Sequence, residues 1–189
     1  NPYGDTKRVV ETMLANHAAA YGLRYAALRY FNAAGADADS EIGERHEPET
    51  HLIPLVLQVA LDQREEIAVF GTDYPTPDGT AIRDYVHVSD LATAHMAALE
   101  HRCSDTPDPV IANLGKGRGY SVREIVETCS NVTGHAIPQR NAPRRSGDPA
   151  ELVADASRAN RMLNWKPLQS DLETIVASAW RWHHADAQT

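Results

Sequence analysis

Short apolar runs alternate with helical patterns along most of this chain. The runs are dense in apolar, β-branched or aromatic residues and span residues 23–31, 67–70, 85–88 and 110–114. Helical spacing of apolar residues occupies residues 3–21, 51–61 and 89–101, and a final helix carries Trp180 and Trp182. When a helix connects two strands, the second strand can lie parallel to the first. The sequence therefore predicts an α/β fold with largely parallel strand pairing.

Polar residues mark where several of these elements begin or end. The first apolar run stops at Asn32-Ala33-Ala34-Gly35, which predicts a strand that feeds a functional loop. Ser89-Asp90 predicts a helix N-cap, and a serine three residues before a glutamate predicts a capping box at Ser121 and at Ser170. Gly134 stands where the helix after Ser121 is expected to end.

The charge and cysteine content disfavour several classes of protein. With 26 Asp and Glu against 18 Lys and Arg, the formal net charge is −8, whereas a general nucleic-acid-binding protein usually presents a basic face. No apolar stretch approaches the length of a membrane span, and the first residues form neither a basic nor an apolar leader. Cys103 and Cys129 lack the spacing of metal ligands and are expected to be small buried hydrophobes. We therefore expect a cytoplasmic protein without a metal site and without a nucleic-acid or membrane partner.

Tyr3 and Lys7 stand four residues apart at the start of the first predicted helix. This spacing places both side chains on one helix face. A nearby ammonium group favours the ionised form of a phenol, so Lys7 could make Tyr3 a usable base near neutral pH. An ordinary helix surface carries the same spacing, and the pattern alone leaves that alternative open.

Arginine is concentrated locally in this acidic chain. Arg140, Arg144 and Arg145 precede the turn Ser146-Gly147-Asp148, and Arg83 precedes a predicted strand. Guanidinium groups bind phosphates through paired hydrogen bonds, and a carboxylate suits the vicinal hydroxyls of a ribose. Salt bridges with neighbouring Asp and Glu are the alternative interpretation, and the sequence does not decide between them.

Six groups of residues are more specific than these patterns. In chain order they are Asn1-Pro2-Tyr3-Gly4, Leu28-Arg29-Tyr30-Phe31-Asn32, Phe70-Gly71-Thr72-Asp73-Tyr74-Pro75-Thr76, Asp78-Gly79-Thr80 with Arg83-Asp84-Tyr85-Val86-His87-Val88, Asn113-Leu114-Gly115, and Arg144-Arg145 with Gly147-Asp148. Together they resemble the UDP-glucose 4-epimerase family of the extended short-chain dehydrogenase/reductases, and the resemblance covers essentially all 189 residues. The block from Asp73 to Val88 separates this family best from its relatives.

The resemblance implies a division of the chain into two parts. Residues 1–35 would be the C-terminal piece of a Rossmann-type NAD-binding domain, with the Y-x-x-x-K helix and the strand after it. Residues 36–189 would mainly form the smaller α/β domain that binds the UDP-sugar, with residues of about 80–100 packing back on the Rossmann part. Family members begin with a Rossmann half that carries a glycine-rich turn for the pyrophosphate of NAD, and no such turn occurs in this sequence. The chain is therefore expected to be the C-terminal part of an enzyme and inactive alone.

The resemblance also implies NAD as cofactor and UDP-glucose and UDP-galactose as substrates. Tyr3 would be the catalytic base and Lys7 its partner, both in contact with the cofactor, and Phe31 would lie against the cofactor. The substrate-binding residues would be Asn32, His51, Leu52, Ala68, Val69, Phe70, Arg83, Tyr85, Arg145, Asp148 and Leu152. Among them, Asn32 would hold the sugar diphosphate, residues 68–70 the uracil, Arg83 and Arg145 the diphosphate, and Asp148 the uridine ribose.

Two of these positions depart from the family pattern, and both concern substrate contacts. His51 stands where many members have Asn, which puts its contact to the diphosphate in doubt. Leu152 stands where some have Tyr, so UDP-N-acetylhexosamines become candidate substrates. The family is also homodimeric, and Val9, Val10, Met13 and Leu14 provide more apolar surface than one face of the first helix needs.

Two other functions stay open at this stage. One is a related nucleotide-sugar epimerase, dehydratase or decarboxylase of the same superfamily, against which the block from Asp73 to Val88 argues. The other is a non-catalytic module that binds UDP or a protein partner. A glycine-rich β-α-β unit upstream in the reading frame would favour an enzyme over the module.

Overall fold

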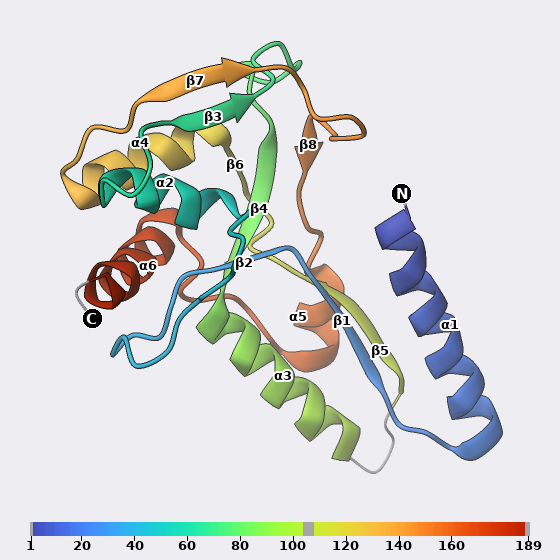
Figure 1. Cartoon of the computed structure of the whole chain (residues 1–189). Coiled ribbons are helices and arrows are strands. Elements are labelled where there is room, and N and C mark those ends of the chain that lie inside the picture. Colours follow the sequence, from blue (N-terminus) through green and yellow to red (C-terminus); the bar gives the residue numbers. More distant parts are fainter. Residues whose placement is uncertain (1, 104–107, 188–189) are drawn as a thin grey trace.

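The computed structural model describes residues 2–103 and 108–187, and Figure 1 shows how their helices and strands are arranged. The helices are α1 (Pro2–Tyr21), α2 (Leu52–Ala60), α3 (Val88–Cys103), α4 (Val122–Thr133), α5 (Ser157–Leu163) and α6 (Leu172–Asp186). The strands are β1 (Ala26–Tyr30), β2 (Asn32–Ala34), β3 (Ile67–Phe70), β4 (Ile82–His87), β5 (Val110–Leu114), β6 (Gly119–Ser121), β7 (Gln139–Ala142) and β8 (Glu151–Leu152).

Most strand pairs are parallel, which confirms the predicted α/β class. β1 pairs with β5, β2 with β4, β3 with β7 and β4 with β8, all in parallel. β6 runs antiparallel to β4. The segment Asn32-Ala33-Ala34 is therefore strand β2 and not the start of a loop, because it adds to the edge of β4.

Strand β4 lies between two hydrophobic cores. Helices α2, α4 and α6 enclose the first core and gather on the left of Figure 1, while α3 and α5 pack with β1 and β5 around the second. Tyr85 belongs to the first core and Val86 to the second, because successive side chains of a strand point to opposite faces. Packing against both cores therefore holds β4, and the strands paired with it, in position.

Asp84, buried in β4, is held by main-chain N–H groups from two other segments. Its carboxylate accepts hydrogen bonds from the N–H groups of Lys116 at 3.0 Å, Gly117 at 2.9 Å and Ala154 at 3.1 Å. Gly117 adopts a positive φ of 74°, which lets the loop turn toward the carboxylate. A buried carboxylate is stable only when it is hydrogen-bonded in this way, so Asp84 fixes the position of the chain that follows β8.

The start of α3 differs from the prediction made from Ser89-Asp90. The helix begins directly after β4, so both residues lie in its first turn. Asp90 is buried and accepts hydrogen bonds from the N–H groups of Leu168 and Gln169, both at 2.9 Å, and from the hydroxyl of Ser170. Its role is therefore to bind the segment before α6, a long-range contact that a capping pattern cannot indicate.

One predicted capping box is confirmed and the other is wrong. The Ser121 hydroxyl accepts from the N–H of Glu124, and the Glu124 carboxylate accepts from the N–H of Ser121. At α6 the N-cap is Asp171, whose carboxylate accepts from the N–H of Thr174 at 3.0 Å. Ser170 is instead occupied by its hydrogen bond to Asp90.

Helix α1 is tied to the rest of the fold through polar contacts. It has no buried residue, and the guanidinium group of Arg29 in β1 forms a bidentate ion pair with the carboxylate of Glu11. In the view of Figure 1, β1 and β5 run between α3 and α1. Val9, Val10 and Met13 of α1 are exposed in this structure, whereas Leu14 is half-buried.

Two further observations concern the cysteines and the membrane. Cys129 is buried as expected, but Cys103 is exposed because it ends α3 at the surface. None of the helices in residues 2–103 and 108–187 combines the length and apolar content needed to cross a bilayer.

Candidate functional site

The first part of the candidate site is the pair Tyr3 and Lys7 on α1. The helix brings Lys7 over the Tyr3 ring, with Nζ at 4.9 Å from the ring centroid. The Tyr3 side chain is 73% exposed, so its hydroxyl can be reached from outside the chain. The geometry thus places an ammonium group beside an accessible phenol ring.

The second part is built along β4, where four of the predicted substrate residues come together. Asn32 lies opposite Tyr85 in the β2–β4 register, and Arg83 lies opposite Leu152 in the β4–β8 register. The Asn32 amide also donates a hydrogen bond of 2.7 Å to the carbonyl of Asp84. Strand pairing therefore brings residues from β2 and β8, which are far apart in the sequence, beside those of β4.

Arg83 contacts a fifth predicted residue, Asp148, in the loop between β7 and β8. Arg83 Nη2 lies 3.0 Å from Asp148 Oδ1, and Nη1 donates to the carbonyl of Ile82 at 2.7 Å. The guanidinium group is mostly covered, whereas the Asp148 carboxylate is half exposed. One cation and one anion are thus held side by side, as recognition of a phosphate next to a ribose requires.

Tyr85 is suited to donate a hydrogen bond but not to act as a base. It is buried in the first core, and burial raises the pKa of its phenol above the ordinary value of 10.0. The phenol therefore stays protonated at neutral pH. Between the two tyrosines of the predicted site, only exposed Tyr3 has the surroundings of a base.

The third part lies on β3 and the segment after β7. The Arg145 guanidinium group stacks on the Phe70 ring at 4.1 Å from the centroid. Within the described residues Arg145 has no ion pair, so the hydrogen-bonding edge of its guanidinium group remains available to an anion. β3, which contains Ala68 and Val69, pairs with β7 and with no other strand of the described residues. Its second edge is therefore open and could pair with a nucleobase.

The other two arginines of this cluster form salt bridges. Arg140 Nε lies 2.6 Å from Glu66 Oε1, and Arg144 Nε lies 2.7 Å from Asp73 Oδ1. Arg144 also stacks on the Tyr74 ring. For these two residues the salt-bridge interpretation is confirmed.

Three predicted residues, His51, Leu52 and Phe31, have other surroundings, and Leu52 is partly buried against the first core. His51 precedes α2, whose first residue is Leu52, and its ring turns toward the carboxylates of Glu44 and Glu49. Phe31 lies between β1 and β2, and its N–H donates to the carbonyl of Leu114 at 3.1 Å. The exposed hollow of about 520 Å³ beside Gly117 and Trp165 contains none of the predicted residues.

Asp84 is the important residue that the sequence analysis did not assign. By binding both the Gly117 loop and Ala154, it determines where β8 and Leu152 lie beside Arg83. Its position between Arg83 and Tyr85, two predicted site residues, could have indicated a structural role for Asp84. Alternation along a strand implies that a charged residue there points to the opposite side from both neighbours.

Comparison with known proteins identifies the family to which the chain belongs. The family model described as "NAD dependent epimerase/dehydratase family" matches residues 1–115. A curated UDP-glucose 4-epimerase from Halalkalibacterium halodurans is 57% identical over 97% of this chain and 54% of its own length. A second, from Streptococcus mutans, is 51% identical over 97% of this chain and 55% of its own length. The chain thus spans about half the length of the curated relatives it matches.

Solved structures give the same result for the fold. The UDP-glucose 4-epimerase from Brucella ovis in complex with NAD is 51% identical, with a TM-score of 0.91 over 96% of this chain and 55% of that one. The enzyme from Bifidobacterium longum in complex with NAD+ and UDP is 40% identical, with a TM-score of 0.91 over 99% of this chain and 56% of that one. The architecture of this chain therefore matches part of the Rossmann-type epimerase fold.

Proposed function

The chain belongs to the NAD dependent epimerase/dehydratase family, and we propose that it supplies the base and the UDP-sugar site of a UDP-glucose 4-epimerase. The proposal rests on residues gathered around β4. Asn32 lies opposite Tyr85, Arg83 lies opposite Leu152, and Arg83 also contacts Asp148. The identity of 57% over nearly the whole chain to an enzyme of that name supports it. The reaction would interconvert UDP-glucose and UDP-galactose at C4 of the hexose.

The residues present fit one end of NAD. Tyr3 and Lys7 could hold the nicotinamide ribose, and Phe31 could lie against the ring. The two direct strand-to-helix junctions of the described chain, β4–α3 and β6–α4, lack a glycine-rich turn that could hold the pyrophosphate. We therefore propose that residues outside this chain bind the adenosine half, consistent with a match to about half of each relative.

Tyr3 performs the proton transfer in this proposal. Bound NAD would supply the chemistry of hydride acceptance and return at C4. The Tyr3 phenolate accepts the proton of the 4-hydroxyl group and later gives it back on the other face of the sugar. Lys7 lies over the same ring and would place its positive charge beside the reacting group.

The substrate residues would bind the nucleotide firmly and the hexose loosely. Arg83 and Arg145 would hold the diphosphate, Asp148 the uridine ribose, and the open edge of β3 the uracil. Leu152, which is 48% exposed, would contact the hexose without a hydrogen bond. A firmly held nucleotide with a loosely held hexose would let the 4-keto sugar turn its other face toward the bound cofactor, while Tyr3 returns the proton to the 4-oxygen. Since Leu is smaller than Tyr and has no hydroxyl, we propose that UDP-N-acetylhexosamines are also accepted.

Helix α1 would take part in a homodimer of the complete protein. Val10 shares the face of Tyr3 and Lys7, whereas Val9 and Met13 form a second exposed apolar face. One face would serve the catalytic site and the other would pack on a second copy. The thiols favour a reducing compartment such as the cytoplasm, because Cys129 is buried and unpaired, and burial raises its pKa to about 12.

The test is a fused protein in which this chain follows the N-terminal part of the Halalkalibacterium halodurans relative. We expect it to convert UDP-galactose into UDP-glucose, and we expect the 189-residue chain alone to be inactive. Product analysis separates the alternatives, since a dehydratase or decarboxylase would change the composition of the sugar. A fused protein that folds and binds UDP but leaves the sugar unchanged would indicate a binding module.

A further inference from the structure

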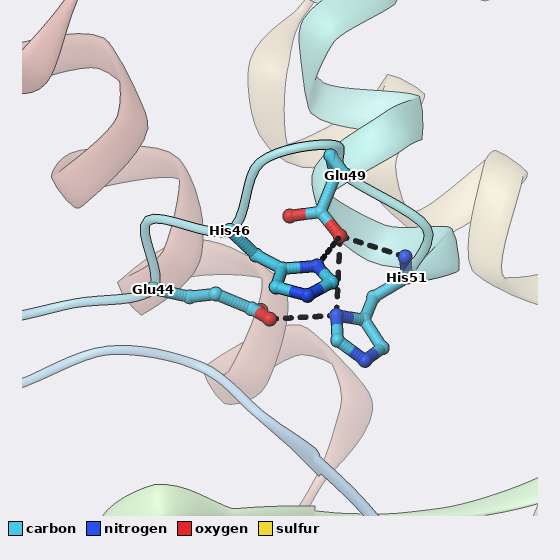
Figure 2. A group of neighbouring side chains, drawn as sticks. All are labelled: Glu44, His46, Glu49 and His51. Atoms are coloured by element: carbon cyan, nitrogen blue, oxygen red, sulfur yellow. Dashed lines mark hydrogen bonds and ion pairs between the residues drawn. The ribbon is translucent and has the colours of Figure 1, made fainter.

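Four side chains of the loop between β2 and α2 converge outside the residues that carry the proposed chemistry. They are Glu44, His46, Glu49 and His51, and one ligand atom of each lies within 4.8 Å of every other. Figure 2 shows both carboxylates directed at the His51 ring, with the His46 ring beside them. The sequence analysis expected no metal site because it considered cysteine spacing alone.

The separations match the spacing of ligands around a small metal ion. His51 Nδ1 lies 2.6 Å from Glu44 Oε1 and 3.1 Å from Glu49 Oε1, and His46 Nδ1 lies 3.6 Å from the same Glu49 oxygen. In a tetrahedral zinc site with bonds of about 2.1 Å, neighbouring ligand atoms are about 3.4 Å apart. Side-chain shifts on the order of 1 Å would therefore centre an ion among the four groups.

Two carboxylates of the cluster compete for one histidine nitrogen. A single ring nitrogen, His51 Nδ1, faces both Glu44 and Glu49, and it carries at most one hydrogen for two carboxylates. A dication would bind both carboxylates at once and accept the lone pairs of two neutral imidazoles. The two negative charges would then be balanced by the ion.

The loop is also fixed before any ion binds. The Glu49 side chain is only 7% exposed, and its Oε1 accepts from the N–H groups of Thr50 at 2.6 Å and His51 at 2.7 Å. Trp182 of α6 donates from Nε1 to the carbonyl of Glu44 at 3.0 Å. These contacts limit the entropy that ligand ordering would otherwise cost.

Arg45 adds a further tie between the loop and α6. Its guanidinium group forms an ion pair with the carboxylate of Asp186. The loop is thus bound to α6 at Glu44 itself and at the residue after it.

We propose that Glu44, His46, Glu49 and His51 bind one divalent transition-metal ion, with Zn²⁺ as the best fit. Two nitrogen and two oxygen ligands in a compact cluster suit Zn²⁺ better than Mg²⁺ or Ca²⁺, which prefer oxygen ligands in larger number. The ion would lock the loop that leads into α2. The cluster shares His51 with the predicted substrate-binding residues but contains neither Tyr3 nor Lys7, so metal binding can be measured separately from the proposed proton transfer.

The experiment titrates the untagged 189-residue chain, treated with chelator and dialysed, with Co²⁺ and then with Zn²⁺. We expect one equivalent of Co²⁺ to produce the intense visible absorption of a four-coordinate site, and Zn²⁺ to displace it. Calorimetry should give a Zn²⁺ dissociation constant in the micromolar range or below. The readout needs no cofactor or substrate, so its failure is distinguishable from failure of the proposed function.

Variants show whether these four residues are the ligands. His46→Ala removes an exposed ligand and Glu49→Gln a more buried one, and each should weaken Zn²⁺ binding at least about tenfold. His17→Ala, which removes an exposed histidine of α1, is the matched control and should bind Zn²⁺ as the parent chain does. Circular dichroism verifies folding of the Glu49→Gln variant. No saturable binding, or equal binding by the parent chain and His46→Ala, would overturn the proposal.

Discussion

Arg83 Nη2 lies 3.0 Å from Asp148 Oδ1, and the two residues are 65 positions apart in the sequence. The contact joins a guanidinium group assigned to phosphate with a carboxylate assigned to ribose. It therefore holds both groups in position before the nucleotide binds, which reduces the cost of ordering them on binding.

Replacing this carboxylate should weaken nucleotide binding. In the fused protein, Asp148→Ala should raise the dissociation constant of UDP about tenfold, because a charged hydrogen bond to the ribose is lost. Asp73→Ala removes the carboxylate of another Asp–Arg pair, that with Arg144, and should leave UDP affinity unchanged. Calorimetric titration with UDP measures both. Equal losses in the two variants would argue against a specific role for Asp148.

Gly35 should tolerate no larger residue. It has a φ of 85°, and a Cβ added there would lie 2.7 Å from the His87 ring and 2.9 Å from Ser178 Oγ. Gly35→Ala should therefore lower the free energy of unfolding by about 3 kcal/mol or more. Gly134 has a similar φ of 74°, and no atom lies within 4 Å of a Cβ added there. Gly134→Ala should therefore lower the free energy of unfolding by only about 1 kcal/mol. Denaturant unfolding of both variants measures the difference, and equal costs would show that the close packing does not matter.

His87 should make stability depend on pH. Burial lowers its pKa below 6.5, although the carboxylates of Asp90 and Asp171 oppose this effect. The N–H of Ser89 donates to Nδ1 at 3.1 Å, which leaves Nε2 to donate to Ser178 Oγ at 3.0 Å, so the fold uses the neutral ring. Its stabilisation is fully present above the unfolded-state pKa of about 6.5 and is lost as the pH falls through the lowered folded-state pKa.

The matching variant is His87→Gln. The difference in free energy of unfolding between the parent chain and this variant should shrink as the pH falls from about 7.5 to about 5. Chemical unfolding at several pH values measures it. A difference that stays constant over this range would mean that His87 does not titrate as its burial implies.

Leu152 should control substrate range. Leu152→Tyr in the fused protein would place a ring beside the hexose, where an N-acetyl group has to fit. The ratio of kcat/KM for UDP-N-acetylgalactosamine over UDP-galactose should fall about 10- to 200-fold, as is typical of a steric difference of about 1–3 kcal/mol. An unchanged ratio would show that Leu152 does not face the sugar.

The sequence predicted those features that depend on neighbouring residues. The capping box of Ser121 and Glu124 and the Tyr3–Lys7 pair each need only three or four residues of helix, so local spacing determines them. Asp90 and Ser170 were misassigned because their hydrogen bonds reach across the fold. Local patterns carry no information on such partners.

The elements that were missed have little apolar periodicity of their own. β7 has the sequence Gln139-Arg140-Asn141-Ala142 and pairs with the apolar strand β3. β8 has only two residues and pairs with the longer strand β4. The Glu44–His51 cluster was missed for a similar reason. Its residues follow neither strand nor helix spacing, and only the path of the loop brings them together.

If Tyr3 is the base of a C4 epimerisation, Tyr3→Phe should slow the turnover of UDP-galactose by the fused protein. We predict that kcat falls by about 10² to 10⁴, as for loss of a general base, while KM changes by less than about threefold. Tyr21→Phe, at the other exposed end of α1, is the control and should keep full activity. Near-normal turnover by Tyr3→Phe would contradict the account, because the proton would then pass through another group.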